Sequence, residues 1–259
     1  MGFLLFAITF SLHQISFADP MNFDIHVLEK QARYVQKIQT ELNTDHVYYH
    51  TPAHNHVLES HRMQDFTRDY QVTCIPALKE CHLAKIDQVI YPNAGNLTEA
   101  IVHMWNNGVN SIVDETADVI DHKLIRSGNE IINTAFLSQG MRDLVAKFGY
   151  PLYMTKPIPK DVVLHRIPEK GIHLRTSKRY TGSITQLNCG GRAPVTNYGY
   201  TIPSLCDHLF LCKKTPTPSM QGITCNNKHI TTSILYKCFC CPGYVDLDDP
   251  LCHCFKTDG

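Results

Sequence analysis

The sequence predicts an α+β fold in which helices come first, a small mixed or antiparallel sheet follows, and a disulfide-rich C-terminal module closes the chain. Three observations predict it. Apolar residues recur at helical spacing before Pro151, and short β-rich runs broken by Pro, Gly and Asn follow it. Nine of the 11 cysteines lie in the last 71 residues. Segregated helices and strands are typical of α+β domains rather than of a doubly wound parallel sheet.

Residues 1–18 predict a signal peptide. The apolar run from Phe3 to Phe10 is too short to cross a bilayer, and Ser16-Phe17-Ala18 supplies small residues where a signal peptidase cuts. Cleavage would leave Asp19 first. No later stretch approaches the roughly 20 apolar residues that a membrane helix needs, so we expect a secreted, extracellular chain without a membrane span.

Helices are expected in the segment 19–73, which we interpret as helical and polar, and in the first part of a domain over 74–212. Apolar spacing predicts them over 24–42, 77–90, 97–107, 115–125 and 129–148. Asn96 would cap the helix over 97–107 and Gly108 would end it, while Gly149 would close the last one.

Strands are expected after Pro151, because the apolar pattern becomes short and β-rich. The predicted strands cover 162–167, 172–176, 183–189, 198–202 and 208–212. The residues 213–219, with two prolines, are interpreted as a linker. They lead into the cysteine-rich tail, 213–259, which we treat as a separate module.

Two stretches of the domain resemble a known family. The run Ile184–Cys189, then Arg192, Thr196-Asn197 and Asp207–Leu211, resembles the closing motif of fasciclin-type adhesion domains. Residues 109–116 lie where that family has its first strand and the start of the following helix. The resemblance covers about 74–212 and implies a wedge of helices beside a small sheet, in a protein of cell adhesion.

The tail resembles a second family. Residues 231–237 lead into Cys240-Cys241-Pro242-Gly243-Tyr244 and then Cys252, which is similar to the end of the emilin-type EMI module. That module accompanies fasciclin domains in some matrix proteins. The resemblance implies a place in the extracellular matrix.

All the cysteines are disulfide candidates: Cys74, Cys81, Cys189, Cys206, Cys212, Cys225, Cys238, Cys240, Cys241, Cys252 and Cys254. Cys74 and Cys81 are expected to pair with each other, with Cys74 in a turn and Cys81 on the helix behind Pro76. The nine others are an odd number, so one is free, pairs outside the tail, or links a second chain as a disulfide-bonded homodimer. The disulfides could also be structural staples with no further function.

Histidines suggest an alternative, because His46, His50, His54, His56 and His61 fall within sixteen positions. His50 and His54 have the i,i+4 spacing of a helical metal site, yet Pro52 breaks the helix and no His-Glu-x-x-His motif is present. Zinc binding by the tail, through Cys238, Cys240, Cys241, Cys252, His253 and Cys254, has unsuitable spacing, and oxidation is favoured in an exported chain. We assign no catalytic residue, metal ligand or cofactor, since nucleophile elbows and phosphate loops are absent as well.

Charge and surface signals are few. Acidic and basic residues balance at 24 each, which argues against a nucleic-acid partner. A local basic cluster, Lys170, Arg175, Lys178 and Arg179, would suit a heparin-like partner, although a solvated surface is the simpler interpretation. Asn96-Leu97-Thr98 is a glycosylation sequon, unless Asn96 serves only as a helix cap.

The sequence therefore favours a secreted, non-enzymatic binding or adhesion protein whose partner is an extracellular protein or matrix component. Tyr198, Tyr200, Tyr236 and Tyr244 are candidate contact residues, because tyrosine offers a large area with a polar end. The binding surface itself stays unknown. The alternatives are a cystine-knot-like ligand or antagonist of a cell-surface receptor and a metal-dependent enzyme that uses the His46–His61 stretch.

Overall fold

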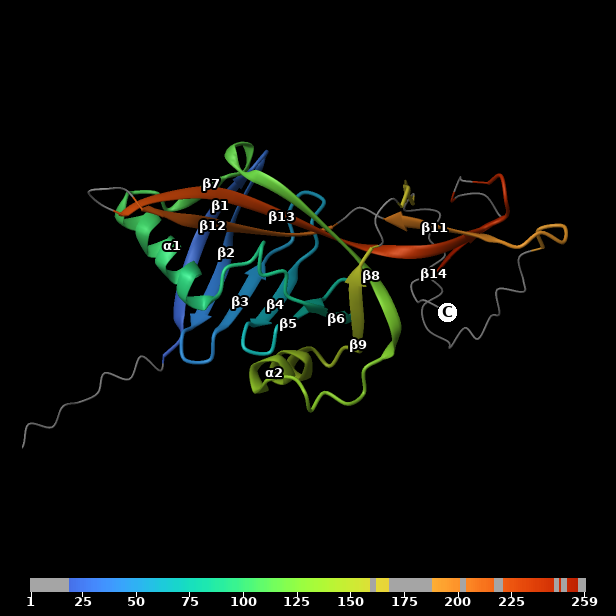
Figure 1. The fold of residues 1–259 in the computed structure, drawn as a ribbon, viewed down its shortest axis with the longest axis horizontal. Coiled ribbons are helices and arrows are strands. Elements are labelled where there is room, and N and C mark those ends of the chain that lie inside the picture. Colours follow the sequence, from blue (N-terminus) through green and yellow to red (C-terminus); the bar gives the residue numbers. More distant parts are fainter. Residues whose placement is uncertain are drawn as a thin grey trace, which may run out of the picture.

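The fold is dominated by β-structure. The computed structural model describes residues 19–158, 162–167, 188–200, 204–216, 221–244, 247 and 251–255. Within these residues 14 strands belong to one mixed sheet and only two α-helices are present (Figure 1). The expected α+β fold with helices first is therefore wrong. The predicted signal peptide, 1–18, lies outside the described residues.

An antiparallel meander makes the first half of the sheet. Its strands are β1 (Met21–Glu29), β2 (Ala32–Glu41), β3 (His46–Thr51), β4 (Ser60–Asp65), β5 (Tyr70–Ile75) and β6 (Glu80–Lys85). Each pairs with the next along the chain. The short β7 (Ser111–Val113) adds to β1 in parallel.

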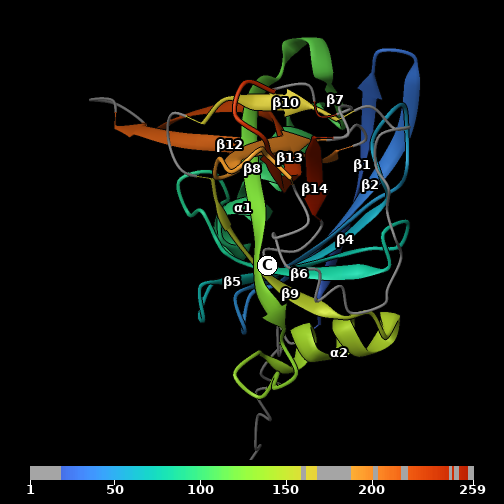
Figure 2. The ribbon, with the colours of Figure 1, turned by 90° about the vertical axis from the view of Figure 1, so that its right-hand side faces the viewer.

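The second half continues the sheet from β6. It contains β8 (Asp118–Glu130), β9 (Leu152–Pro157), β10 (Leu164–Arg166), β11 (Val195–Tyr200), β12 (Leu205–Pro216), β13 (Gln221–Cys240) and β14 (Cys252–Phe255). The strand order is β10-β11-β13-β8-β9-β6-β5-β4-β3-β2-β1-β7, with β12 and β14 paired to β13. The long β13 thus runs from the ladder with β12 to the ladders with β11 and β14 (Figures 1 and 2).

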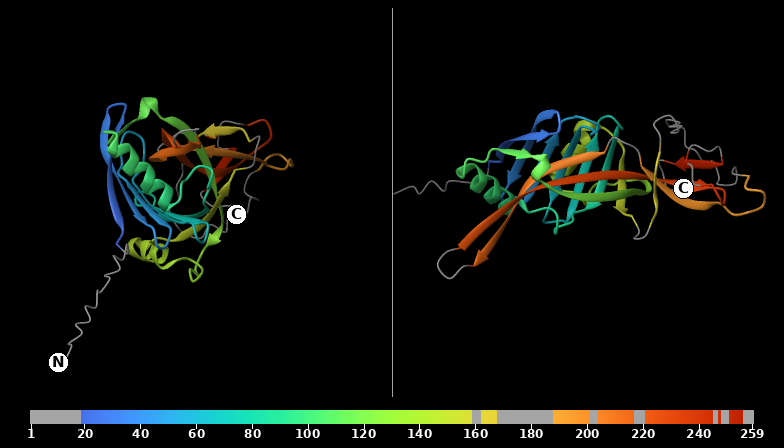
Figure 3. Two further views of the ribbon diagram at one scale, coloured as in Figure 1. Left: turned by 60° about the vertical axis from the view of Figure 1, so that its left-hand side comes forward. Right: turned by 90° about the horizontal axis from the view of Figure 1, so that it is seen from above.

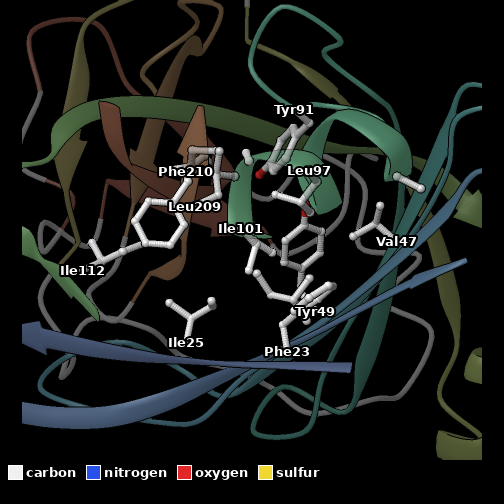
Figure 4. Packing of buried hydrophobic residues seen from close by; sticks show 14 of the residues in the cluster. Phe23, Ile25, Val47, Tyr49, Tyr91, Leu97, Ile101, Ile112, Leu209 and Phe210 are labelled. Atoms are coloured by element: carbon white, nitrogen blue, oxygen red, sulfur yellow. The ribbon is translucent and has the colours of Figure 1, made fainter. Parts of the chain in front are cut away.

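The first core lies where the sheet curves around α1 (Ala94–Asn106), as the left view of Figure 3 shows. The buried face of α1, with Leu97 and Ile101, packs against inward side chains of β1 to β3 and against Leu209 and Phe210 of β12 (Figure 4). Burying such a face is the main source of stability for a short helix. The helix therefore ties the meander to the β12–β13 ribbon.

The second core lies on the opposite face of the meander, under α2 (Gln139–Phe148). Leu137, Met141 and Leu144 pack there with Val72, Leu83 and Leu152, beside the Cys74–Cys81 disulfide. Because both faces are covered, nearly every residue of β4 and β5 is buried. Among the described residues, no helix is long and apolar enough to cross a membrane.

The helix expected over 24–42 is instead the β1–β2 hairpin. Along β1 the buried residues alternate, as Phe23, Ile25, Val27 and Glu29, which is the period of a strand with one buried face. The turn was hard to recognise, because Lys30 holds the left-handed φ of 52° that glycine or asparagine usually adopts.

Three other predicted helices also fail in whole or in part. The stretch 77–90 is a turn followed by β6, and 115–125 is the end of a 3₁₀ turn (Asp114–Thr116) followed by β8. In 129–148 only the last ten residues are helical, as α2. The turn before β6 again uses a non-glycine left-handed residue, Lys79, so that strand boundary lacked its usual signal.

Other elements follow the sequence more closely. The helix expected over 97–107 is α1, although Asn93 caps it by accepting from the Asn96 N–H. Gly149 ends α2 in the left-handed conformation, as expected. The strands expected at 162–167, 198–202 and 208–212 overlap β10, β11 and β12. Those at 172–176 and most of 183–189 lie outside the described residues, and the supposed linker begins inside β12.

Five disulfides staple the sheet, namely Cys74–Cys81, Cys189–Cys241, Cys212–Cys225, Cys238–Cys254 and Cys240–Cys252. The expected Cys74–Cys81 pair is confirmed, but it joins directly opposite residues of β5 and β6 rather than a turn and a helix. Three more bonds also join opposite residues of paired strands. Several disulfides of this kind are typical of extracellular proteins.

A buried ion pair crosses the inside of the sheet. Arg62 of β4 donates to Asp207 of β12 and to the Tyr91 hydroxyl, and its Nε–H donates to Thr73 Oγ1 at 3.0 Å. Arg62 is 1% exposed and Asp207 is fully buried. Two such charges are tolerated only when they compensate each other, so the pair fixes β12 against the meander.

Breaking this pair should destabilise the fold strongly. We expect Arg62→Met alone to lower the free energy of unfolding by about 3–5 kcal/mol, because Asp207 would be left buried and uncompensated. The double variant Arg62→Met/Asp207→Leu should be more stable than Arg62→Met alone. Denaturant unfolding measures both. The control is Glu99→Gln, which removes the exposed pair with Lys214 and should cost less than about 1 kcal/mol.

Candidate metal centre

A polar cluster lies where β12 passes the ends of β1 and β2. Strand β12 forms its ladder with β13 on one edge. On its other edge, the backbone N–H and carbonyl of His208 hydrogen-bond to a side chain. Gln36 of β2 accepts from the His208 N–H at 2.8 Å and donates to the His208 carbonyl at 2.6 Å. The amide thus replaces a neighbouring strand and holds β12 beside the meander.

Local structure delivers six potential ligands to this place. Glu29 ends the buried face of β1, and His54 lies in the connection between β3 and β4. Cys206 and His208 are two positions apart on β12 and so share a face, while His229 of β13 lies directly opposite His208. Asp114 comes from the 3₁₀ turn after β7.

His54 makes the most informative contacts. Its Nδ1 lies 2.8 Å from the Pro52 carbonyl, which only accepts, so Nδ1 carries a proton. Its Nε2 lies 2.8 Å from Glu29 Oε2 and 3.5 Å from Cys206 Sγ. With its one proton on Nδ1, a neutral imidazole would point the Nε2 lone pair at the Glu29 carboxylate. A proton or a cation must therefore lie between His54 Nε2 and Glu29.

His208 and His229 complete the cluster. Their rings stack with centroids 4.3 Å apart. Asp114 Oδ1 lies 3.3 Å from His208 Nε2 and 2.6 Å from His229 Nδ1, the latter without hydrogen-bond geometry. Nε2 of His229 is buried and has no hydrogen-bond partner among the described residues. One donor atom each from Glu29, Cys206 and His229 lies within 4.8 Å of the others, and the same holds for Asp114, His208 and His229.

Burial sets the electrostatics of these groups. It raises the pKa of the Cys206 thiol, and the neighbouring Asp207 carboxylate adds to the shift. It lowers the pKa of His208 to about 4, with His229 as the second cause. Tyr34 stacks on His54 with centroids 3.8 Å apart, and burial followed by Cys206 raises the pKa of its hydroxyl. The interior therefore favours neutral side chains unless a cation is bound.

The donor set suits a borderline transition metal. Cys, His and Glu are the ligands that zinc uses, with bond lengths of about 2.0 to 2.3 Å. A metal-binding histidine commonly donates its other N–H to a backbone carbonyl, as His54 does to Pro52. Glu29 is also oriented by the Asn55 amide at 3.3 Å. Glu29, Cys206 and His229 would hold the ion, because their donor atoms lie within 4.8 Å of one another, with His54 beside Glu29 and Cys206.

The histidines singled out from the sequence separate into different places. His46 pairs with Asp65 at 3.2 Å, and His56 is exposed. His50 and His61 lie together on β3 and β4, away from His54. The helical i,i+4 spacing of His50 and His54 has no meaning here, because the segment is a strand followed by a loop.

Sequence reasoning missed most of this cluster. Glu29 was placed on a helix, Cys206 was counted only as a disulfide candidate, and His208, His229 and Asp114 were given no site role. One signal was available in the odd number of cysteines, because at least one of them cannot form a disulfide within the chain. Cys206 is that cysteine, free and buried.

Other predicted site residues are placed as follows. Tyr244 is 42% exposed, Tyr198 and Tyr200 are half-buried, and Tyr236 is buried. The four tyrosines therefore differ in how accessible they are to a partner. The basic cluster from Lys170 to Arg179 lies outside the described residues. Asn96 is exposed in the first turn of α1, and its side chain is not the cap.

Comparison with known proteins adds no relative: no family model, curated protein or solved structure matches the chain. The fasciclin and EMI resemblances therefore stay predictions.

The chain should hold one unreactive thiol. We expect no reaction of Cys206 with a bulky thiol reagent in the native state and one equivalent after denaturation, because its sulfur is enclosed by the cluster. A colorimetric thiol assay with and without denaturant measures this. A doubling of mass on a non-reducing gel would instead show that an intermolecular disulfide uses a cysteine of this chain.

Asn96 should accept a glycan. Since Asn93 supplies the cap, the Asn96 amide is free to project into solvent. Expression in a glycosylating host should give a mass that falls after endoglycosidase treatment, and Asn96→Gln should remove the shift without changing the melting temperature. Asn93→Gln is the control, since it should retain the glycan and lose the cap.

Proposed function

We propose that the chain is an exported, disulfide-braced extracellular protein that acts by binding rather than catalysis. The polar cluster around Cys206 and His54, called the inner cluster from here on, would bind a divalent transition metal, Zn²⁺ by preference. The ligands are Glu29, Cys206 and His229, and His54, which lies beside Glu29 and Cys206, is the candidate fourth ligand. The extracellular protein or matrix partner that the sequence predicts would bind to other surfaces of the molecule.

The single observation that carries the metal proposal is the position of the unpaired thiol. Ten cysteines are joined in disulfides, and the eleventh lies 3.5 Å from His54 Nε2. In an oxidising compartment a free cysteine is a liability, whereas a coordinated thiolate is held out of disulfide exchange. Metal binding gives this residue a role that fits both its neighbours and the compartment.

Charge and ligand type favour zinc over calcium or magnesium. A bound divalent ion would neutralise the Glu29 carboxylate and a Cys206 thiolate together, in a place where each would otherwise be buried and costly. Calcium and magnesium take oxygen ligands, while thiolate and imidazole select zinc and its neighbours. With His54 as the fourth protein ligand no position stays open, which is the pattern of a binding or structural site rather than a catalytic one.

The test uses the full secreted chain and two metals. We expect about one equivalent of Zn²⁺ that competes with Co²⁺, and a thiolate-to-cobalt charge-transfer band when Co²⁺ binds. Cys206→Ser should remove the band and weaken Zn²⁺ by more than about tenfold, and His54→Gln should weaken it comparably, since loss of even an outer-shell partner costs 10- to 100-fold.

The matched control is His26→Gln, because His26 lies on the same strand as Glu29 but on its exposed face. It should bind both metals like the wild type. A Co²⁺ complex of the folded wild-type chain without the thiolate band would contradict the proposal.

A further inference from the structure

A second group of metal-binding side chains lies on the other face of the sheet. Along β3 the inward residues Val47 and Tyr49 belong to the core around α1, while Tyr48 packs toward α2. Because side chains alternate along a strand, His50 shares the face of Tyr48. The group is therefore separate from the inner cluster, which faces β12.

His50 and His61 are directly opposite each other in the β3–β4 ladder. Their rings stack with centroids 4.3 Å apart and planes 10° apart. Cross-strand neighbours of this kind are held at a fixed separation by two backbones, so little side-chain entropy is lost when both bind one ligand.

The two imidazoles converge on one point. Nε2 of His50 lies 3.0 Å and Nε2 of His61 lies 3.1 Å from the same oxygen, Glu59 Oε1. The three donor atoms lie within 4.8 Å of one another. Hydrogen bonds from the two Nε2 atoms to Glu59 satisfy this arrangement in the absence of metal. An ion that binds both Nε2 atoms, with each ring's proton on Nδ1, would keep all three ligands nearly in place.

The surroundings support a ligand role for His61. The Tyr48 hydroxyl lies 2.7 Å from its Nδ1 and can either donate or accept, so it can hold the tautomer that leaves Nε2 free. The Phe148 ring of α2 packs on the imidazole with centroids 4.8 Å apart and fixes its plane. His50, by contrast, is 26% exposed and Glu59 is 40% exposed, so an ion has access from solvent.

We infer that His50, Glu59 and His61 form a second, solvent-facing site for a divalent late transition metal, with Cu²⁺ as the preferred ion. Two imidazoles and one carboxylate form an N₂O set that leaves further positions to solvent, which suits tetragonal Cu²⁺. The site has no thiolate, so zinc gains no special advantage there. Without such a ligand the Irving–Williams order places Cu²⁺ above the other divalent ions.

The experiment titrates Cu²⁺, supplied as a weak amino-acid complex, into the full chain and into Cys206→Ser, which lacks the thiolate of the inner cluster. We expect Cys206→Ser to retain one Cu²⁺ whose electron paramagnetic resonance spectrum shows coupling to two nitrogens. His50→Gln in that background should weaken this Cu²⁺ by more than about tenfold and remove the two-nitrogen pattern.

His56→Gln is the matched control, since His56 lies in the same connection but is exposed and outside both groups. It should bind Cu²⁺ like its parent. Thermal unfolding of each variant confirms that it is folded. Unchanged Cu²⁺ affinity in His50→Gln would overturn the inference, whereas loss of Zn²⁺ binding alone bears only on the inner cluster.

Discussion

The buried ion pair between Arg62 and Asp207 is the constraint on which the rest of the structure depends. It lies inside the curve of the sheet and joins the meander to a strand 145 residues later in the chain. Since successive residues of a strand face opposite ways, Asp207 on one face of β12 places Cys206 and His208 together on the other face, where both are buried. The position of the proposed ligands on β12 therefore follows from a charge that must be compensated in the core.

The sequence predicted the end of α1 well, because Gly108 is a strong local signal, but it placed the start three residues late, since Asn93 and not Asn96 is the cap. It failed for the meander for an equally local reason. Lys30 and Lys79 hold left-handed turn positions without glycine, so the stretches 24–42 and 77–90 looked like continuous helices. Charged residues on the exposed face of β1, such as Asp24, also resembled the polar face of an amphipathic helix.

The candidate sites were predictable only in part. The density of histidines from 46 to 61 was visible, and His50, His54 and His61 do lie at the two candidate sites. Their division between two faces depends on the strand period and on a loop at Pro52, which a helical interpretation hides. Glu29 and His229 come from strands about 200 residues apart, and no local pattern reveals that they meet.

Strand register decides which cysteines form disulfides and which one stays free. In the β12–β13 ladder Cys212 lies opposite Cys225, and in the β13–β14 ladder two further pairs are opposite. Cys206 lies opposite Thr231 instead, so it has no cysteine within the reach of a disulfide in its own ladder. Six residues along the same strand thus separate a structural staple from a thiol that faces His54 and Glu29. Since shifting the ladder would disturb both that disulfide and the Arg62–Asp207 pair, the free thiol is a consequence of the fold rather than an unpaired remainder.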